Sequence, residues 1–262
     1  MPSPYPAPAT ITSLRAALVS QGYAYLRAFS PDATGRSLVV LGRTLGSLHV
    51  PSDVDPAHPV LKTHPAADGS YLAPFDRPEA IGWHNDFSTH PERPVLSLAY
   101  LARPDPLGPE HGAWRVASCN RVLDQLHATP DGREIVRFLL DTDLPYSFTG
   151  DGTPSLFRAL EPRGAPPGRL GMRFYGRAIR DGARLAYGTI PEEIERAVRA
   201  VEGAADQVGH VLAAPPGALL VTDNWHSLHD RLPQCVDPNL SLRCSLLCFV
   251  EALHEPLTPP GL

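Results

Sequence analysis

The fold of this chain is decided by the stretch GWHNDF, residues 82–87, in which two side chains able to bind a metal stand two positions apart. His84 and Asp86 point to the same face if this stretch is a β-strand, because side chains i and i+2 of a strand share a face. An imidazole and a carboxylate together suit iron(II) and similar divalent ions. The stretch therefore predicts a metal site on β-structure.

A second stretch, VTDNWHSLHDR at residues 221–231, supplies a distant histidine just after an apolar strand candidate. Its His229 completes a set of two histidines and one carboxylate, which occupies one face of a metal ion and leaves three positions open. His226 competes with His229 for this place. Asp223 and Asn224 are expected to fix the intervening turn through side-chain–backbone hydrogen bonds.

Arg243 is the third feature, 14 residues after His229 (243 − 229) in the apolar segment LSLRCSLLCFVEA, which we expect to be a strand. A guanidinium buried there needs an anionic partner, because an unpaired buried charge is costly. Its planar pair of donors matches a carboxylate. The distal carboxylate of 2-oxoglutarate is such a partner.

Composition limits the classes of protein to consider. The 262 residues are 43% hydrophobic and 19% charged, as in a globular protein, and we expect a single domain over 1–262 that needs no disulfides. The net charge of −5 without a basic block argues against nucleic acid or a membrane as partner. Four cysteines without a C-x-x-C pair, and an N-terminus unlike a secretory signal, indicate a cytoplasmic protein. Because the chain is compact and has no basic patch, we expect its substrate to be a small molecule. The oligomeric state is left open.

Apolar periodicity and turn residues predict the elements along the chain. Helices are expected over residues 11–20, 33–46, 118–140 (one or two, around a turn at 129–132) and 190–205. The second of these is expected to start at Ser30-Pro31-Asp32, and the last to be capped by Thr189. Strands are expected over residues 22–29, 95–102, 217–224 and 240–252. Residues 144–188 are expected to form strands and hairpins, with a turn at Arg180-Asp181-Gly182.

The order of these elements favours a mainly β fold with peripheral helices. Alternation of strand and helix, as in a parallel sheet, is not sustained, so an antiparallel double-sheet core fits better. Residues 50–82 are rich in Pro, Asp, His and Gly and are expected to be a long loop. Long loops in compact domains are often lids or binding loops, and 50–82 with 103–113 are the lid candidates.

The motifs together resemble one known group of enzymes. H-x-D at 84–86, D-N-x-x-x-x-H-x-R at 223–231 and an arginine 14 residues after the last histidine are similar to the TauD/clavaminate synthase superfamily of iron(II)/2-oxoglutarate dioxygenases. Residues 22–29, 93–102 and 111–126 also resemble segments of that superfamily. The resemblance covers most of the chain and implies a double-stranded β-helix, or jelly roll.

The resemblance also implies the roles of the site residues. His84, Asp86 and His229 would bind iron(II), with His229 preferred over His226, and Arg243 would bind 2-oxoglutarate. No catalytic residue is implied beyond the metal centre. With O2, such enzymes oxidise an unactivated C–H bond by hydroxylation, desaturation or ring closure, here of an amino acid or an intermediate of secondary metabolism.

One departure from the superfamily concerns 2-oxoglutarate. A threonine in a G-G-x-T motif also binds the cosubstrate there, but aligning residues 111–114 on that motif puts Trp114 in its place. Either the alignment is shifted, or the cosubstrate finds other donors in this chain.

Other assignments remain open at this point. Arg231, Arg173 and Tyr175 are candidate substrate-binding residues, each with a structural role as the alternative. A zinc hydrolase that uses a metal-bound water is a rival function for the same three ligands. A jelly-roll protein that binds metal and ligand without catalysis is another.

Overall fold

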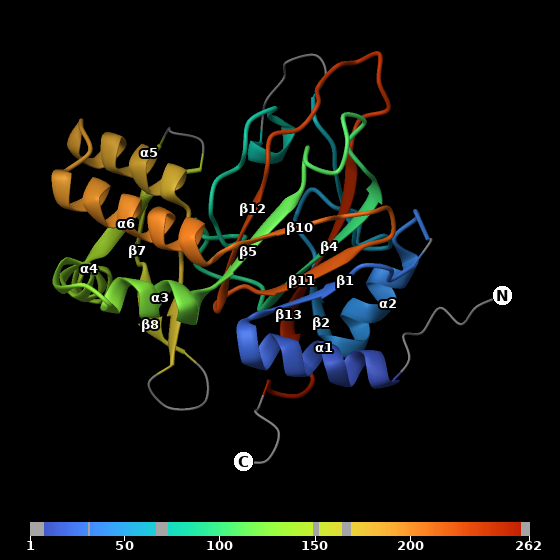
Figure 1. The fold of residues 1–262 in the computed structure, drawn as a ribbon, viewed down its shortest axis with the longest axis horizontal. Coiled ribbons are helices and arrows are strands. Elements are labelled where there is room, and N and C mark those ends of the chain that lie inside the picture. Colours follow the sequence, from blue (N-terminus) through green and yellow to red (C-terminus); the bar gives the residue numbers. More distant parts are fainter. Residues whose placement is uncertain (1–7, 31, 67–72, 149–151, 164–168, 258–262) are drawn as a thin grey trace.

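The computed structural model describes residues 8–30, 32–66, 73–148, 152–163 and 169–257, and Figure 1 shows a β core with helices around it. The larger sheet has the strand order β1-β11-β4-β13-β2, and β3 also pairs with β13. Its strands are β1 (Tyr23–Leu26), β2 (Gly46–His49), β3 (Leu61–Thr63), β4 (Leu96–Arg103), β11 (Leu219–Asp223) and β13 (Cys244–Leu253). All of these pairings are antiparallel.

Two helices, α1 (Pro8–Gln21) and α2 (Arg36–Leu45), cover one face of this sheet. Buried side chains of the helices and of alternate strand positions form one apolar cluster: Leu14, Leu18, Leu38, Leu41, Leu45, Leu96, Leu98, Tyr100, Leu219, Val221, Leu246, Cys248 and Val250. Because side chains alternate along a strand, the positions between them face the opposite way. Two of those, Leu101 and Leu220, cluster with Trp114 of the second sheet.

The second sheet has the order β10-β5-β12 and is also antiparallel. Its strands are β5 (Trp114–Ser118), β10 (His210–Leu212) and β12 (Ser227–Arg231). The expectation of antiparallel sheets with peripheral helices is therefore confirmed.

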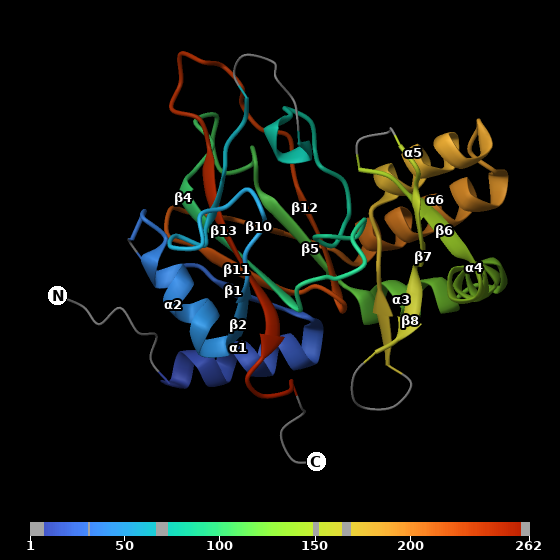
Figure 2. The ribbon, with the colours of Figure 1, turned by 180° about the vertical axis from the view of Figure 1, so that it is seen from behind.

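A helical lobe packs beside the second sheet, as the front and back views show (Figures 1 and 2). It contains α3 (Cys119–His127), α4 (Pro130–Asp141), α5 (Gly176–Tyr187) and α6 (Glu192–Val208), with the hairpins β6 (Asp143–Tyr146)–β7 (Ser155–Arg158) and β8 (Leu160–Pro162)–β9 (Leu170–Met172). The apolar cluster of this lobe includes Trp83 and Leu228, which neighbour His84 and His229 in sequence. The core of the lobe therefore packs against the two segments that carry His84 and His229.

The predicted hairpin at Arg180-Asp181-Gly182 is wrong, because these residues lie in the middle of α5. A Cβ on Gly182 would lie 2.4 Å from the carbonyl oxygen of Pro145, so the glycine permits close packing and does not make a turn. The side chain of Arg180 forms ion pairs at 2.8 Å with Glu195 and with Glu202 of α6.

Several predicted boundaries also differ. The Thr129–Gly132 segment begins α4, with the Thr129 hydroxyl accepting a hydrogen bond from the Gly132 N–H. Helix α2 begins at Arg36 after Gly35 (φ +82°) and not at residue 30, and Pro31 of the predicted start lies outside the described residues. Helix α6 begins at Glu192, with Pro191 and not Thr189 at the N-cap position. The expected loop at 50–82 contains β3 and a 3-10 turn, Pro74–Asp76.

All four cysteines are buried and free. Every helix in the described ranges is too short or too polar to cross a lipid bilayer.

Candidate metal centre

His84 and His229 are adjacent across two segments that are distant in sequence. Each backbone N–H donates to the carbonyl of the other residue at 2.9 Å, which makes an isolated antiparallel bridge. His84 bridges Tyr175 on its other side. The bridges extend the second sheet by two short segments and align the three side chains on one face of it.

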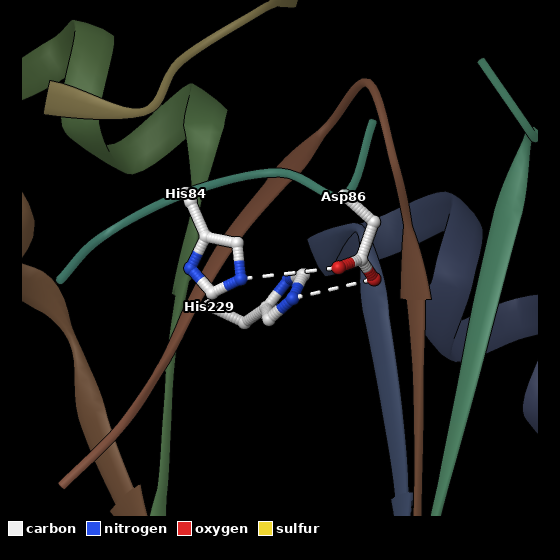
Figure 3. Close-up of side chains that lie close together, drawn as sticks. All are labelled: His84, Asp86 and His229. Atoms are coloured by element: carbon white, nitrogen blue, oxygen red, sulfur yellow. Dashed lines mark ion pairs between the residues drawn. The ribbon is translucent and has the colours of Figure 1, made fainter. Parts of the chain in front are cut away.

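Asp86 completes the cluster. One potential ligand atom from each of His84, Asp86 and His229 lies within 4.8 Å of the other two. The Asp86 carboxylate lies 3.8 Å from Nε2 of His84 and 3.5 Å from Nε2 of His229, and Figure 3 shows both rings turned toward it. The sequence-predicted ligands are thus brought together.

The local backbone is less regular than a strand. Only His84 has a strand-like pairing, and the chain turns at Asp86. Phe87, the next residue, has φ +56°, a left-handed conformation that a bulky side chain rarely adopts. His84 and Asp86 are therefore brought together by a single β-bridge followed by a tight turn, and not by the continuous strand that we expected.

Asn85, between the two ligands, is 1% exposed. Its side chain donates to the carbonyl of Ser227 at 2.6 Å and accepts from the N–H of Phe174 at 2.8 Å. It therefore joins the GWHNDF stretch to both neighbouring segments. We did not single out this residue from the sequence, since nothing local distinguishes a structural asparagine.

The DN pair before His229 fixes both stretches. The Asp223 carboxylate accepts hydrogen bonds from the N–H groups of Trp225 and His226, as expected for a turn. Asn224 instead reaches across to the first stretch, where its amide donates to the carbonyl of Asp86 at 2.8 Å. The pair thereby holds the turn of each stretch in place.

His226 is held away from the cluster. Its Nδ1 lies 2.8 Å from the Asp223 carboxylate, and the three-residue cluster contains His229 in its place. Of the two histidines that competed on sequence, the structure brings His229 to His84 and Asp86.

Protonation states in the cluster suit a divalent cation. Burial and, to a smaller extent, the neighbouring His229 lower the pKa of His84 to about 4, so this imidazole is neutral. Its Nδ1 lies 2.8 Å from the carbonyl of Gly82, which requires the proton on Nδ1 and leaves the lone pair on Nε2. Burial alone would raise the pKa of Asp86, but His229 and His84 hold it well below its ordinary value. Neutral imidazole and ionised carboxylate are the forms that bind metal.

Arg243 is buried, and no described residue forms an ion pair with it. It lies one residue before β13, not inside the strand as predicted, and is 5% exposed. Its Nε and Nη2 have no hydrogen-bond partner among the described residues. Burial and, to a smaller extent, the nearby charge of Arg231 lower its pKa to about 9. Such a cation requires an anionic ligand.

The surroundings of Arg243 leave room for its side chain, but the nearest acid among the described residues, Asp105, acts on it only from beyond ion-pair distance. A Cβ on Gly112 would lie 2.5 Å from the Arg243 Cδ, so this glycine permits the close approach. The guanidinium lies 5.8 Å from the ring of Trp114. Trp114 therefore packs beside the guanidinium and, unlike the threonine of the superfamily motif, offers no hydroxyl group there.

Two of the three candidate substrate residues are engaged elsewhere. Arg173 donates to the carbonyls of Ser88, His90 and Pro91 and so holds the turn after Asp86. Arg231 donates to the carbonyls of Leu232, Pro74 and Arg77.

The third candidate, Tyr175, has a free hydroxyl group. The residue is 4% exposed, and its ring centroid lies 5.5 Å from that of His84. Its hydroxyl has no partner among the residues that the structure describes.

Comparison with known proteins bears on the whole chain. The sequence model of the taurine catabolism dioxygenase TauD, TfdA family matches residues 2–244. Among curated proteins, none matches the chain in sequence.

Solved structures with a similar fold include asparagine oxygenase in complex with Fe(II), 2S,3S-3-hydroxyasparagine and succinate, at a TM-score of 0.72, 18% identity, and coverage of 93% of this chain and 80% of that one. The non-heme iron oxygenase OrfP in complex with Fe and alpha-ketoglutaric acid aligns at a TM-score of 0.66 and 16% identity, with coverage of 93% and 80%. OrfP with Fe and L-Arg gives 0.61 and 16%, again with 93% and 80% coverage. At these identities the likeness shows the fold.

Proposed function

Because the chain belongs to the TauD, TfdA family of dioxygenases, we propose that it is an iron(II)- and 2-oxoglutarate-dependent oxygenase that hydroxylates an amino acid. The observation that carries this proposal is the cluster of His84, Asp86 and His229 together with the buried, unpaired guanidinium of Arg243. A metal site alone fits many reactions. A metal site accompanied by a cation that lacks an anion fits a carboxylate cosubstrate.

Each residue has a defined part in this proposal. His84 and His229 would offer imidazole nitrogens to the metal and Asp86 would offer a carboxylate, a set of ligands that leaves room for a cosubstrate. Arg243 would hold the distal carboxylate of 2-oxoglutarate. Bound iron(II) and 2-oxoglutarate together supply, with O2, the oxidising power that cleaves an unactivated C–H bond. Trp114 and Gly112 shape the wall of the cosubstrate site.

The substrate class follows from the similar structures. Asparagine oxygenase holds 3-hydroxyasparagine, and OrfP holds L-Arg. A free amino acid is accordingly the proposed substrate, with desaturation or ring closure as other outcomes at carbon.

We also propose the finer architecture. The two antiparallel sheets, whose facing sides share an apolar cluster, are taken as a jelly roll within a single domain over residues 1–262. Segments 50–82 and 103–113 are proposed as lids, although residues 67–72 of the first lie outside the described part. Hydrogen bonds from Arg231 and Gln234 to the carbonyls of Phe75 and Arg77 support the first lid. Four free cysteines favour a reducing, cytoplasmic setting.

Release of succinate tests the function. Purified protein given iron(II), ascorbate and 2-oxoglutarate should form succinate and develop a visible charge-transfer band on anaerobic addition of the cosubstrate. Removal of the metal with a chelator should stop the turnover, and iron(II), but not zinc(II), should restore it. Activity restored by zinc without 2-oxoglutarate would favour a hydrolase. Binding of both ligands without oxygen consumption, with every amino acid offered, would favour a non-catalytic protein.

A further inference from the structure

The carbonyl of Arg77 is held firmly beside the strand that carries His229. It accepts hydrogen bonds from Arg231 at 3.0 Å and from Gln234 at 2.9 Å. Both donors are nearly fully buried, with 4% and 6% of their surface exposed. The backbone of Arg77 is therefore held by two buried side chains, although the residue lies in a loop.

The donors of Arg77 are not used within the described part of the chain. Its Nε is buried without a hydrogen-bond partner, and no acidic group among the described residues lies within ion-pair distance of its guanidinium. A buried donor without a partner costs about 1–3 kcal/mol, and more when it is charged. A bound ligand that accepts a hydrogen bond from the Arg77 guanidinium would remove this cost.

The hydroxyl of Tyr175 is the second unused donor in this region. Tyr175 pairs with His84, which pairs in turn with His229 of β12. Arg231 lies two residues after His229 on the same face of β12, and its side chain donates to the Arg77 carbonyl at 3.0 Å, so the backbone of Arg77 is held over this face as well. The Tyr175 phenol can donate a hydrogen bond. Its ring lies 5.5 Å from that of His84, centroid to centroid, so the donor is beside the metal ligands.

The acids that face this phenol are already neutralised. Asp230 accepts from Arg115 at 2.7 Å, and Asp181 accepts from Arg184 at 2.7 Å. Neither is within ion-pair distance of Arg77. The free groups are therefore donors only, and a carboxylate, which only accepts, is the ligand that matches them.

This region is separate from the Arg243 site. Arg231 lies between the two: it pairs with Trp114 of β5, whose ring lies 5.8 Å from the Arg243 guanidinium, whereas His84 and then Tyr175 lie on the other side of β12. Its guanidinium donates to the carbonyls of Leu232, Pro74 and Arg77, so it divides the two sites without joining either.

We propose that Arg77 and Tyr175 form a second carboxylate site, which binds the α-carboxylate of the amino-acid substrate beside the metal ligands. This inference rests on the proposed function. It assigns substrate selection to Arg77 and Tyr175 and requires that the substrate carry a carboxylate. Holding this group fixes which carbon of the amino acid faces the metal.

The test begins with the wild-type protein and a panel of the common L-amino acids, each paired with its carboxamide. At least one amino acid should accelerate succinate release, and its carboxamide should not. Arg77→Gln should then raise the KM for that amino acid by about 10- to 100-fold, because hydrogen bonds to charged groups are worth ~1.5–3 kcal/mol. Tyr175→Phe, which removes one oxygen and keeps the packing, should raise it by about 2- to 10-fold.

Two further measurements separate a binding role from a structural one. The affinity of Arg77→Gln for 2-oxoglutarate, titrated anaerobically through the charge-transfer band, should stay within about twofold of wild type. Arg177→Gln is the matched control, because Arg177 is two residues from Tyr175 but is half exposed and has Asp181 at 3.8 Å. This control should leave the KM for the amino acid unchanged, and Arg77→Lys should recover part of what Arg77→Gln loses.

The proposal fails if no amino acid accelerates succinate release, or if a carboxamide serves as well as the acid. It also fails if both variants keep the wild-type KM, or if Arg77→Gln loses affinity for 2-oxoglutarate instead. A wild-type protein that forms no succinate and binds no 2-oxoglutarate would instead overturn the proposed function, so the two failures are distinct.

Discussion

Asn85→Ala removes the side chain that ties together three segments of the metal centre. Two buried hydrogen bonds are lost, one to the carbonyl of Ser227 at 2.6 Å and one from the N–H of Phe174 at 2.8 Å. Each backbone group left without a partner costs about 1–3 kcal/mol, so the variant should lose roughly 2–6 kcal/mol of unfolding free energy. For a chain of this length each kcal/mol lowers Tm by about 2–4 °C, and we expect a drop on the order of 10 °C.

The assay is thermal unfolding of the metal-free protein followed by circular dichroism, with iron(II) affinity measured separately by calorimetry. Iron affinity should fall roughly tenfold or more, because the side chain sets the spacing of the two segments that carry ligands. Asn239→Ala is the matched control. That asparagine is exposed, and its side chain donates to Asp237 and to no other described residue. Its loss should change stability by less than about 0.5 kcal/mol.

Asn85→Asp separates the two bonds. It keeps an acceptor for the Phe174 N–H, loses the donor to Ser227 and buries a charge, so it should be at least as unstable as the alanine variant. A Tm of Asn85→Ala within about 2 °C of wild type would refute the reasoning. A lower Tm with unchanged iron affinity would show that the asparagine stabilises the fold without setting the ligand spacing.

Three further outcomes are expected. Arg243→Met, which keeps most of the buried volume, should weaken 2-oxoglutarate binding by about 100-fold in a titration of the charge-transfer band, and unchanged affinity would contradict the cosubstrate assignment. His229→Ala should bind less than a stoichiometric amount of iron by metal analysis, whereas His226→Ala should keep full loading; the reverse would exchange their roles. Hydrogen bonds from Arg180 lower the pKa of Glu195 below its ordinary 4.5, so their stabilisation is present above that pH and is lost as the pH falls through the folded-state pKa. Arg180→Met should therefore cost about 1 kcal/mol in urea denaturation at neutral pH, since solvent screens the pair, and clearly less near pH 3; a cost that grows on acidification would contradict this.

The metal ligands were predictable because they belong to short patterns. Spacing within H-x-D and within the later DN-containing stretch is local, so it can be recognised without the fold. Arg243 was recognisable as a charge in an apolar run, and the structure moves it by only one residue, to the position before β13.

Other features depend on partners that are remote in sequence. Arg180-Asp181-Gly182 has the chemistry of a turn, and its helical conformation depends on Glu195 and Glu202 in α6. The partners of Asn85 are 89 and 142 residues away, so its importance has no local signal. Arg77 lies in a loop without periodicity, and only the anchors in and after β12 reveal that its position is fixed.

The paired hydrogen bonds between His84 and His229 join residues 145 positions apart (229 − 84). Closing a loop of that length is an entropic cost that precedes any gain from the contact, and such distant pairings form late in folding. Iron therefore cannot act as a nucleus around which the chain collapses. Iron can bind tightly only after the segments that carry His84 and His229 have paired. The rate of iron uptake during refolding would therefore report the rate at which these two segments pair.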